Sequence, residues 1–131
     1  EEVVADGVRG EPDVNLVATR DAGGVSILVY HYHDDDEPGP VAEVTIAIDG
    51  WTGKPPALRH YRMDEAHSNA FAVWKTMGSP QDPTGAQYAE LEAAGQLAQI
   101  EATDAVSVEN GNIVLRTTLP RQGVSLLRLE A

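Results

Sequence analysis

The first group of residues that could do chemistry is a pair of histidines followed by a carboxylate. His31 and His33 are two residues apart, so on a β-strand both side chains would leave the same face, and Asp34 comes next. Imidazole and carboxylate groups together could bind a divalent transition metal. Apolar residues two, four and six positions before His31 share that face, so the histidines could equally end a core row beside a solvated acidic turn. We assign no metal to this strand-end cluster.

A second group of polar residues follows another predicted strand. Its members, which we call the corner cluster, are His60, Arg62, Asp64, Glu65, His67 and Asn69. A carboxylate close to a histidine could serve as a general acid or base. The alternative is a hydrogen-bonded corner, in which Arg62 pairs with a carboxylate and Asn69 ties down the turn. On spacing alone we favour the hydrogen-bonded corner over acid–base chemistry.

Sequence motifs for several common chemistries are missing. The chain contains no GxSxG, Walker-type, GxGxxG or HExxH pattern. A retaining glycosidase needs two carboxylates about 5–5.5 Å apart, and nothing in the spacing of the carboxylates selects such a pair. Trp51, Trp74, Tyr30 and Tyr32 could form a sugar-stacking platform. A carbohydrate-binding module is therefore an alternative function.

The composition describes one acidic globular domain. The chain has 131 residues, 42% hydrophobic and 23% charged, which suits a single two-layer core. Its net charge of −12 argues against nucleic-acid and anionic-membrane partners. It has no apolar run of about 20 residues and no signal peptide, so we expect a soluble protein and leave its compartment open between bacterial cytoplasmic and exported. The absence of cysteine excludes disulfide and cysteine-ligated zinc frameworks and says nothing of the redox compartment. The chain opens on Glu1 rather than Met, which suggests a domain of a longer polypeptide.

Alternating apolar residues predict a mainly β chain. Strands are expected over residues 14–20, 25–33, 42–48, 57–64, 106–108, 113–119 and 124–129. Asn110-Gly111 is the strongest hairpin signal among their connections. The second strand is apolar on both faces, which predicts a central strand with cover on each side. The pattern indicates an antiparallel β-sandwich of about seven to eight strands.

A long excursion over residues 60–97 interrupts the strands. Ser68 or Asn69 could cap a first helix that ends at Gly78, and Thr84 begins a second helix with a capping box to Gln87. The predicted two-helix insertion covers about residues 68–95, with Ala70, Val73, Trp74 and Met77 on one helix face and Tyr88 and Leu91 on the other helix's buried stripe. Helices this short are marginal in water, so we expect them to dock on a surface.

Several stretches resemble the C-terminal region of glycoside hydrolase family 39 β-xylosidases. They include residues 6–10 (DGVRG), 31–36 (HYHDDD), 60–70 (HYRMDEAHSNA), 73–74 (VW), 77–81 (MGSPQ), 87–92 (QYAELE) and 119–127 (LPRQGVSLL). Their order covers nearly the whole chain. A shorter Trp…Gly-x-Pro…Gln pattern is similar to α-L-iduronidases of the same family.

The resemblance implies a parent enzyme with a (β/α)₈ catalytic barrel, absent here, and residues 1–131 as its single accessory β-sandwich domain. It places the acid/base and nucleophile glutamates on the barrel, and no residue of this chain matches their motifs. The parent would be a retaining β-xylosidase that releases terminal β-1,4-linked xylose from xylo-oligosaccharides, while this chain alone would be inactive. The implied partner is the barrel, with neighbouring subunits of a homo-oligomer as a further option, and the corner cluster would then lie at such an interface. The resemblance implies no catalytic, cofactor-binding or metal-binding residue in this chain, and no cofactor, nucleic acid or membrane. For the alternative function, a carbohydrate-binding module, the resemblance implies xylan as the ligand.

Overall fold

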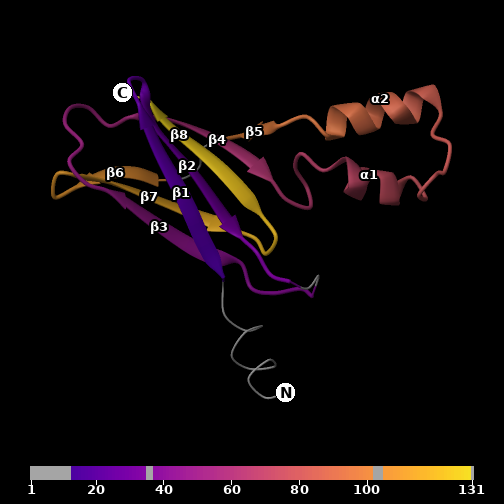
Figure 1. The fold of residues 1–131 in the computed structure, drawn as a ribbon, viewed down its shortest axis with the longest axis horizontal. Coiled ribbons are helices and arrows are strands. Elements are labelled where there is room, and N and C mark those ends of the chain that lie inside the picture. The colour runs from indigo at the N-terminus through magenta and orange to yellow at the C-terminus, as the bar shows by residue number, and fades with distance from the viewer. Residues whose placement is uncertain (1–12, 35–36, 102–104, 131) are drawn as a thin grey trace, which may run out of the picture.

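Two antiparallel sheets form a β-sandwich, and a helical arm projects from one end (Figure 1). The structure is a computed structural model that describes residues 13–34, 37–101 and 105–130. Residues 6–10 of the family resemblance, together with Asp35 and Asp36, lie outside the described residues. The predicted mainly β sandwich with a two-helix insertion is confirmed. No helix in the described part of the chain is long and apolar enough to cross a membrane.

The two sheets differ in size. Sheet A has the strand order β1 (Val14–Asp21), β2 (Gly24–His31), β8 (Val124–Glu130), β4 (Ala57–Met63), β5 (Ala98–Ile100). Sheet B has the order β3 (Ala42–Ile48), β7 (Asn112–Leu119), β6 (Ala105–Glu109). The short strand β5 was not predicted, because three residues carry too little alternation to stand out. The other seven strands lie within a few residues of their predicted positions.

The core lies between the sheets and takes every second residue from each. Sheet A contributes Ile27 and Val29 from β2 and Leu127 and Leu129 from β8, while sheet B contributes Ile46, Leu115 and Leu119. All seven side chains are buried. The alternation predicted for residues 42–48 and 113–119 is therefore the alternation of core and solvent in β3 and β7.

Two turns depend on backbone conformations that favour glycine. In the β6–β7 hairpin, Asn110 and Gly111 both have positive φ, at 52° and 81°, which matches the expected two-residue turn. Gly24, where β2 begins, has φ of 150°, and a Cβ atom there would meet the backbone carbonyl of Leu129. The start of β2 and the end of β8 can thus approach each other this closely only with glycine at this position.

The helical arm, residues 64–97, carries α1 (Ala70–Thr76) and α2 (Gly85–Ala94). Asn69 caps α1 by accepting a hydrogen bond from the Ala72 N–H, and the predicted capping box of Thr84 and Gln87 begins α2. The helices lie side by side, away from both sheets (Figure 1). Neither helix contains a buried residue.

The predicted buried stripe of α2 is wrong for this chain, since Tyr88 is 66% exposed. Periodicity identified a face of the helix, but no surface among the described residues covers that face. The expected cover on both sides of β2 is also wrong within the described residues, because Leu28 on its outer side is 41% exposed. In both places the sequence carries more apolar surface than the described chain buries.

Replacing Thr84 by alanine should loosen α2 without changing the sandwich. The variant loses the oxygen that accepts from the Gln87 N–H, so local stability should fall by about 1 kcal/mol, and α2 amides should exchange about fivefold faster. Hydrogen exchange followed by mass spectrometry checks this. Thr76→Ala, at the end of α1, is the matched control and should leave α2 exchange unchanged. Equal α2 exchange in Thr84→Ala and the unaltered chain would contradict the capping assignment.

Candidate functional site: the polar end of the core

The two polar clusters predicted from the sequence meet at one end of the sandwich. Strands β2 and β4 both pair antiparallel with β8, which lies between them, so they run in the same direction and finish at the same end. His31 ends β2, and the corner cluster begins within β4. Both clusters also bind the end of β7: His31 Nδ1 lies 3.2 Å from the Leu119 carbonyl, and Arg62 donates to the Thr118 carbonyl at 2.8 Å.

The strand-end cluster continues the inward-facing row of β2, which changes from apolar residues to histidines at the end of the strand. His31 and His33 are both buried, and their rings lie edge to face with centroids 5.7 Å apart. Gln122 donates to the His33 carbonyl at 2.7 Å, and the Arg121 guanidinium lies 3.4 Å from the His33 ring nitrogens. Sequence reasoning did not place Arg121 and Gln122 in this cluster, because they come from the turn between β7 and β8.

Asp34 does not turn toward the histidines. It is exposed, and its hydrogen bond to Tyr32 raises the pKa of that phenol. Among the residues that the structure describes, no three histidine or carboxylate side chains gather closely enough to hold a metal ion. The burial of His31 and His33 and their ring contact are those of side chains at the polar end of a core row.

Inside the sandwich, the corner cluster begins with buried polar groups. His60 Nε2 and the Ser125 hydroxyl are 2.7 Å apart, and both residues are buried. Arg62 is also buried; its guanidinium lies 3.5 Å from His60 Nε2 and 3.5 Å from Asp64 Oδ2. Ser125 was missed by sequence reasoning, since only the pairing of β8 with β4 brings its hydroxyl beside the imidazole.

At the exit of β4, Asp64 organises the turn into the arm. Its Oδ1 accepts hydrogen bonds from the backbone N–H groups of Ala66 and His67 at 2.9 Å, and it lies 2.8 Å from His67 Nδ1. Asn69 donates to the Asp64 carbonyl and caps α1 with its own side-chain oxygen. The single carboxylate thus fixes both the strand end and the start of the arm.

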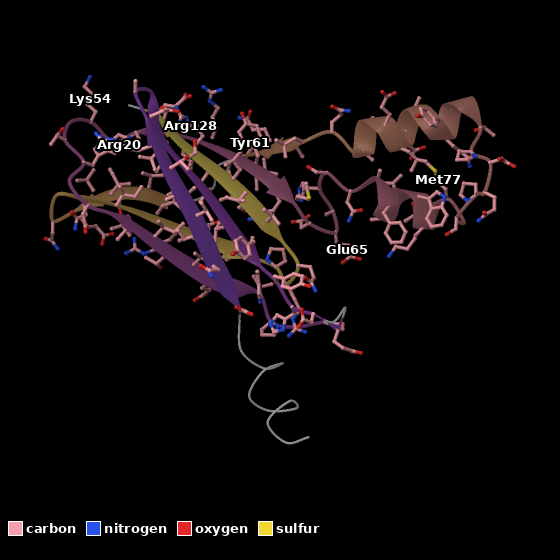
Figure 2. All side chains as sticks on the ribbon, viewed as in Figure 1. Arg20, Lys54, Tyr61, Glu65, Met77 and Arg128 are labelled. Atoms are coloured by element: carbon pink, nitrogen blue, oxygen red, sulfur yellow. The ribbon has the colours of Figure 1, made fainter. Side chains whose placement is uncertain are left out.

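Ser68 joins the two ends of the arm. Its hydroxyl donates to the Arg62 carbonyl and accepts from the Ala98 N–H, both at 2.8 Å, and its φ is +55°. Glu65 is exposed beside it and lines an open hollow of about 600 Å³ with Arg121 and Asn69. In Figure 2, Glu65 lies towards the end of the molecule that carries the arm and Met77. Arg20 and Lys54 lie at the opposite end.

Chemically, this arrangement holds a turn in place. A carboxylate against an imidazole, as in Asp64 and His67, resembles an acid–base pair, but the carboxylate already accepts two backbone N–H groups. Burial acts to raise the pKa of Asp64, while the hydrogen bonds from His67 and the Ala66 N–H act to lower it and prevail, so the pKa lies below its usual value. A carboxylate held ionised in this way is a fixed structural anion.

The four aromatic residues of the sugar-platform hypothesis do not come together. Trp51 lies in the connection between β3 and β4, at the end opposite the arm. Trp74 lies on α1, where its ring stacks on Phe71 at a centroid distance of 5.6 Å. Only Tyr30 and Tyr32 line a common hollow. The fold therefore separates Trp51 and Trp74 from each other and from the two tyrosines, and the four residues form no common platform.

Solved structures share this architecture. A bacterial orthologue of human α-L-iduronidase is 24% identical, with a TM-score of 0.69 over 95% of this chain and 23% of its own. A family 39 glycoside hydrolase from Xanthomonas axonopodis pv. citri is 17% identical, with a TM-score of 0.67 over 88% of this chain and 26% of its own. A monomeric β-xylosidase from Caulobacter crescentus CB15 is 21% identical, with a TM-score of 0.57 over the same shares.

The chain has the fold of one region of family 39 glycoside hydrolases. The resemblance predicted from the sequence is thus confirmed at the level of the fold, and the structures with this fold include β-xylosidases. The chain spans about a quarter of the length of the solved structures it matches. No family model matches the sequence, and no curated protein matches it.

The lowered pKa of Asp64 predicts an acid-sensitive corner. A carboxylate whose folded pKa lies below the unfolded value of about 3.9 stabilises the fold above that pH and loses this contribution as the pH falls through the folded pKa. Asp64→Asn should therefore be less stable than the unaltered chain near neutral pH, by about 1–2 kcal/mol. The difference should close as the solution is acidified below about pH 4.

Thermal melting of both proteins across the acid range measures that difference. Glu65→Gln removes the exposed neighbouring carboxylate and is the matched control, which should melt like the unaltered chain throughout. A gap between Asp64→Asn and the unaltered chain that stays constant with pH would show that the Asp64 charge does not stabilise the corner.

Proposed function

We propose that this chain is an accessory β-sandwich domain of a glycoside hydrolase, a retaining β-xylosidase that acts on terminal β-1,4-linked xylose of xylo-oligosaccharides. The chain contributes a packing surface and no catalytic group. The fold likeness supports a glycosidase parent, since the proteins with this fold have about three quarters of their own length outside the matched region. Fold alone does not define activity, so the substrate part of the proposal depends on the test below.

The helical arm is the observation that carries the accessory role. Helices of 7 and 10 residues fall below the roughly 12–15 residues at which an isolated helix becomes marginal in water. Phe71 is 62% exposed although its ring stacks on Trp74, and Tyr88 is 66% exposed, so both residues present apolar surface to solvent. An arm fixed firmly at its base by Asp64 and Ser68, with an exposed aromatic residue on each helix, suits a contact with another domain.

The occupant we favour is the catalytic barrel of the same polypeptide. One enzyme with this fold is a monomeric β-xylosidase, so neighbouring subunits are not a general requirement of the architecture. A contact within one polypeptide also orders the arm without the translational entropy that a second molecule would lose. We expect the arm to be ordered by this intramolecular contact.

Activity measurements on two proteins test the function. The polypeptide encoded by the complete gene should hydrolyse an aryl β-xyloside at a rate typical of enzymes, roughly 1–1,000 s⁻¹. The 131-residue chain should show only the uncatalysed background. Turnover by the 131-residue chain would overturn the accessory role. Preference of the complete protein for an aryl α-L-iduronide, or no glycosidase activity at all, would overturn the proposed substrate or the proposed parent.

A xylan-binding module is the second candidate function, and Trp51 favours it. This half-buried ring lines an open hollow of about 340 Å³ with Arg20 and Asp49, and its Nε1 donates to the Lys54 carbonyl at 3.0 Å. A fixed aromatic ring beside a few polar groups is a common saccharide site. Calorimetry with xylo-oligosaccharides should give a binding heat that Trp51→Ala abolishes and Trp74→Ala preserves. Absence of heat at millimolar ligand would retire this candidate.

A further inference from the structure

The outer face of sheet A carries two apolar rows that cross the sheet side by side. Strand register places Val17, Leu28, Leu126 and Tyr61 opposite one another in the first row. The second row contains Tyr30, Val124 and Met63, and continuing the β4–β5 register by one residue adds Leu97. Each row has one polar end: Gln99 on β5 lies opposite Tyr61, and Asn15 on β1 lies opposite Tyr30. Directly opposed residues on one face lie about 4.5–5.5 Å apart between Cβ atoms, so the eight side chains form one patch. We call them the outer rows.

The outer rows are open to solvent within the described chain. Val17 is 55% exposed, Met63 50% and Leu97 56%. Single exposed apolar residues are normal, but a contiguous group of this kind on a soluble protein usually marks an interaction site. Apolar residues on both faces of residues 25–33 led us to expect cover on each side, and sheet B covers only the inner side. Within the described chain, no second layer packs on the apolar outer face of sheet A.

The rest of the same face is polar, which gives the patch a boundary. The next row contains Thr19, Ser26, Arg128 and Arg59. Arg128 forms ion pairs with Asp21 and Glu130, and Arg59 pairs with Glu130. In Figure 2, Arg128 lies farther from the arm than Tyr61 does. Apolar character is thus confined to the half of the face nearest the polar end of the core.

We propose that the outer rows pack against the rest of the parent polypeptide, on an uncharged apolar surface of its catalytic domain. The inference rests on the proposed accessory function and names the surface that performs it. Two arguments select this occupant over a second copy. Proteins with this fold have about three quarters of their chain outside the matched region, which supplies a covering domain. A second copy would bring another net charge of −12 to the contact, whereas an uncharged surface adds no repulsion.

The position of the outer rows also joins them to the arm. Met63 is the last residue of β4, and Leu97 immediately precedes β5, so the two residues flank the base of the arm. One covering domain could therefore contact the outer rows and the arm together. Such a continuous surface would bury apolar side chains at its centre and leave the ion pairs of Arg59 and Arg128 at its rim, the usual arrangement of an interface.

Hydroxyl-radical footprinting tests the proposal by measuring side-chain access. It is applied to the polypeptide encoded by the complete gene and to the 131-residue chain, with circular dichroism to establish that each is folded. Tyr61 and Met63 should be labelled several-fold more slowly in the complete polypeptide, while Trp51, at the opposite end, should be labelled equally in both. Equal labelling of Tyr61 and Met63 would overturn the proposal.

A matched pair of variants keeps the test valid if the 131-residue chain does not fold alone. Leu28 and Ser26 both point outward from β2, one in the outer rows and one in the polar row. In the complete polypeptide, Leu28→Glu should raise Met63 labelling several-fold and split the melting transition in two, whereas Ser26→Glu should do neither. Identical behaviour of the two variants would contradict a contact at the outer rows.

The remaining outcomes separate the surface from the function. Protection of Tyr61 that appears in the 131-residue chain only as its concentration rises would identify a second copy as the occupant and overturn our assignment. Protection in a complete polypeptide without glycosidase activity would support the docking surface and overturn the proposed function. Glycosidase activity without protection of Tyr61 would support the proposed function and overturn the docking surface.

Discussion

Replacing Arg62 by methionine should lower the free energy of unfolding by about 3–5 kcal/mol, the usual cost of removing one member of a buried ion pair. The Arg62 and Asp64 side chains are only 9% and 10% exposed. The variant keeps most of the side-chain volume but leaves the Asp64 carboxylate without its nearby cation and the Thr118 carbonyl without its donor. Denaturant unfolding of the 131-residue chain measures the loss.

Arg59→Met is the control for this prediction. Arg59 precedes Arg62 on β4, but its side chain is 50% exposed and pairs with Glu130 at the surface. An exposed pair of this kind contributes at most about 1 kcal/mol, so the control should remain close to the unaltered chain. Equal losses of unfolding free energy in the two variants would mean that the buried interactions of Arg62 stabilise the fold no more than the exposed pair of Arg59 does. In Arg62→Met, amides of residues 64–69 should also exchange faster, because the turn loses its cation.

Replacing Leu127 by alanine should cost about 2–5 kcal/mol, the range for removing a large aliphatic side chain from a core. Leu127 is fully buried on the central strand β8, in the core cluster with Leu115 and Leu119 of sheet B. Truncation leaves a cavity between two sheets whose hydrogen-bonded strands cannot close around it. The denaturant midpoint should therefore fall while the slope of the transition stays constant.

Leu126→Ala provides the control, because Leu126 is the preceding residue of β8 and points to the outer face. It is partly exposed in this chain, so its truncation should cost less than about 1 kcal/mol here. In the complete polypeptide the same change should cost more, since we propose that the outer rows are covered there. A loss for Leu126→Ala equal to that for Leu127→Ala in the 131-residue chain would contradict the assignment of inner and outer faces.

Local signals explain why most of the fold could be predicted. The Asn110-Gly111 turn and the Thr84–Gln87 capping box each depend on residues within four positions of one another, and both have the expected geometry. Strand periodicity worked for the same reason, since one buried face is enough to produce it. β5 escaped notice because its pairing with β4 depends on a chain reversal through the arm.

The candidate site shows where such reasoning stops. The residue types of His31, His60 and Arg62 indicated polar clusters, and the corner at Asp64 was anticipated from its neighbours. That the two clusters meet at one end of the core could not be predicted, since the meeting depends on β8 lying between β2 and β4. Ser125 is the clearest case: nothing in its local sequence relates it to His60, from which it is separated by 65 positions.

The buried stripes predicted for β2 and α2 failed in an informative way. Sequence periodicity reports that a face is apolar, but it carries no information on which molecule covers that face. Leu28 and Tyr88 are exposed in the described chain, and our proposal is that a partner domain covers both faces. Both exposed faces adjoin the same end of the sandwich, which is why one covering domain is the simpler proposal.

The central place of β8 in sheet A has a consequence for biosynthesis. Residues 124–130 leave the ribosome after every other described strand, yet β2 and β4 reach one another only through them. Until then, β2 and β4 each keep an unpaired edge on the side that β8 will occupy, and such edges promote aggregation. We expect the nascent chain to need chaperone protection until residues 124–130 have emerged, and premature termination before residue 124 to yield an insoluble product.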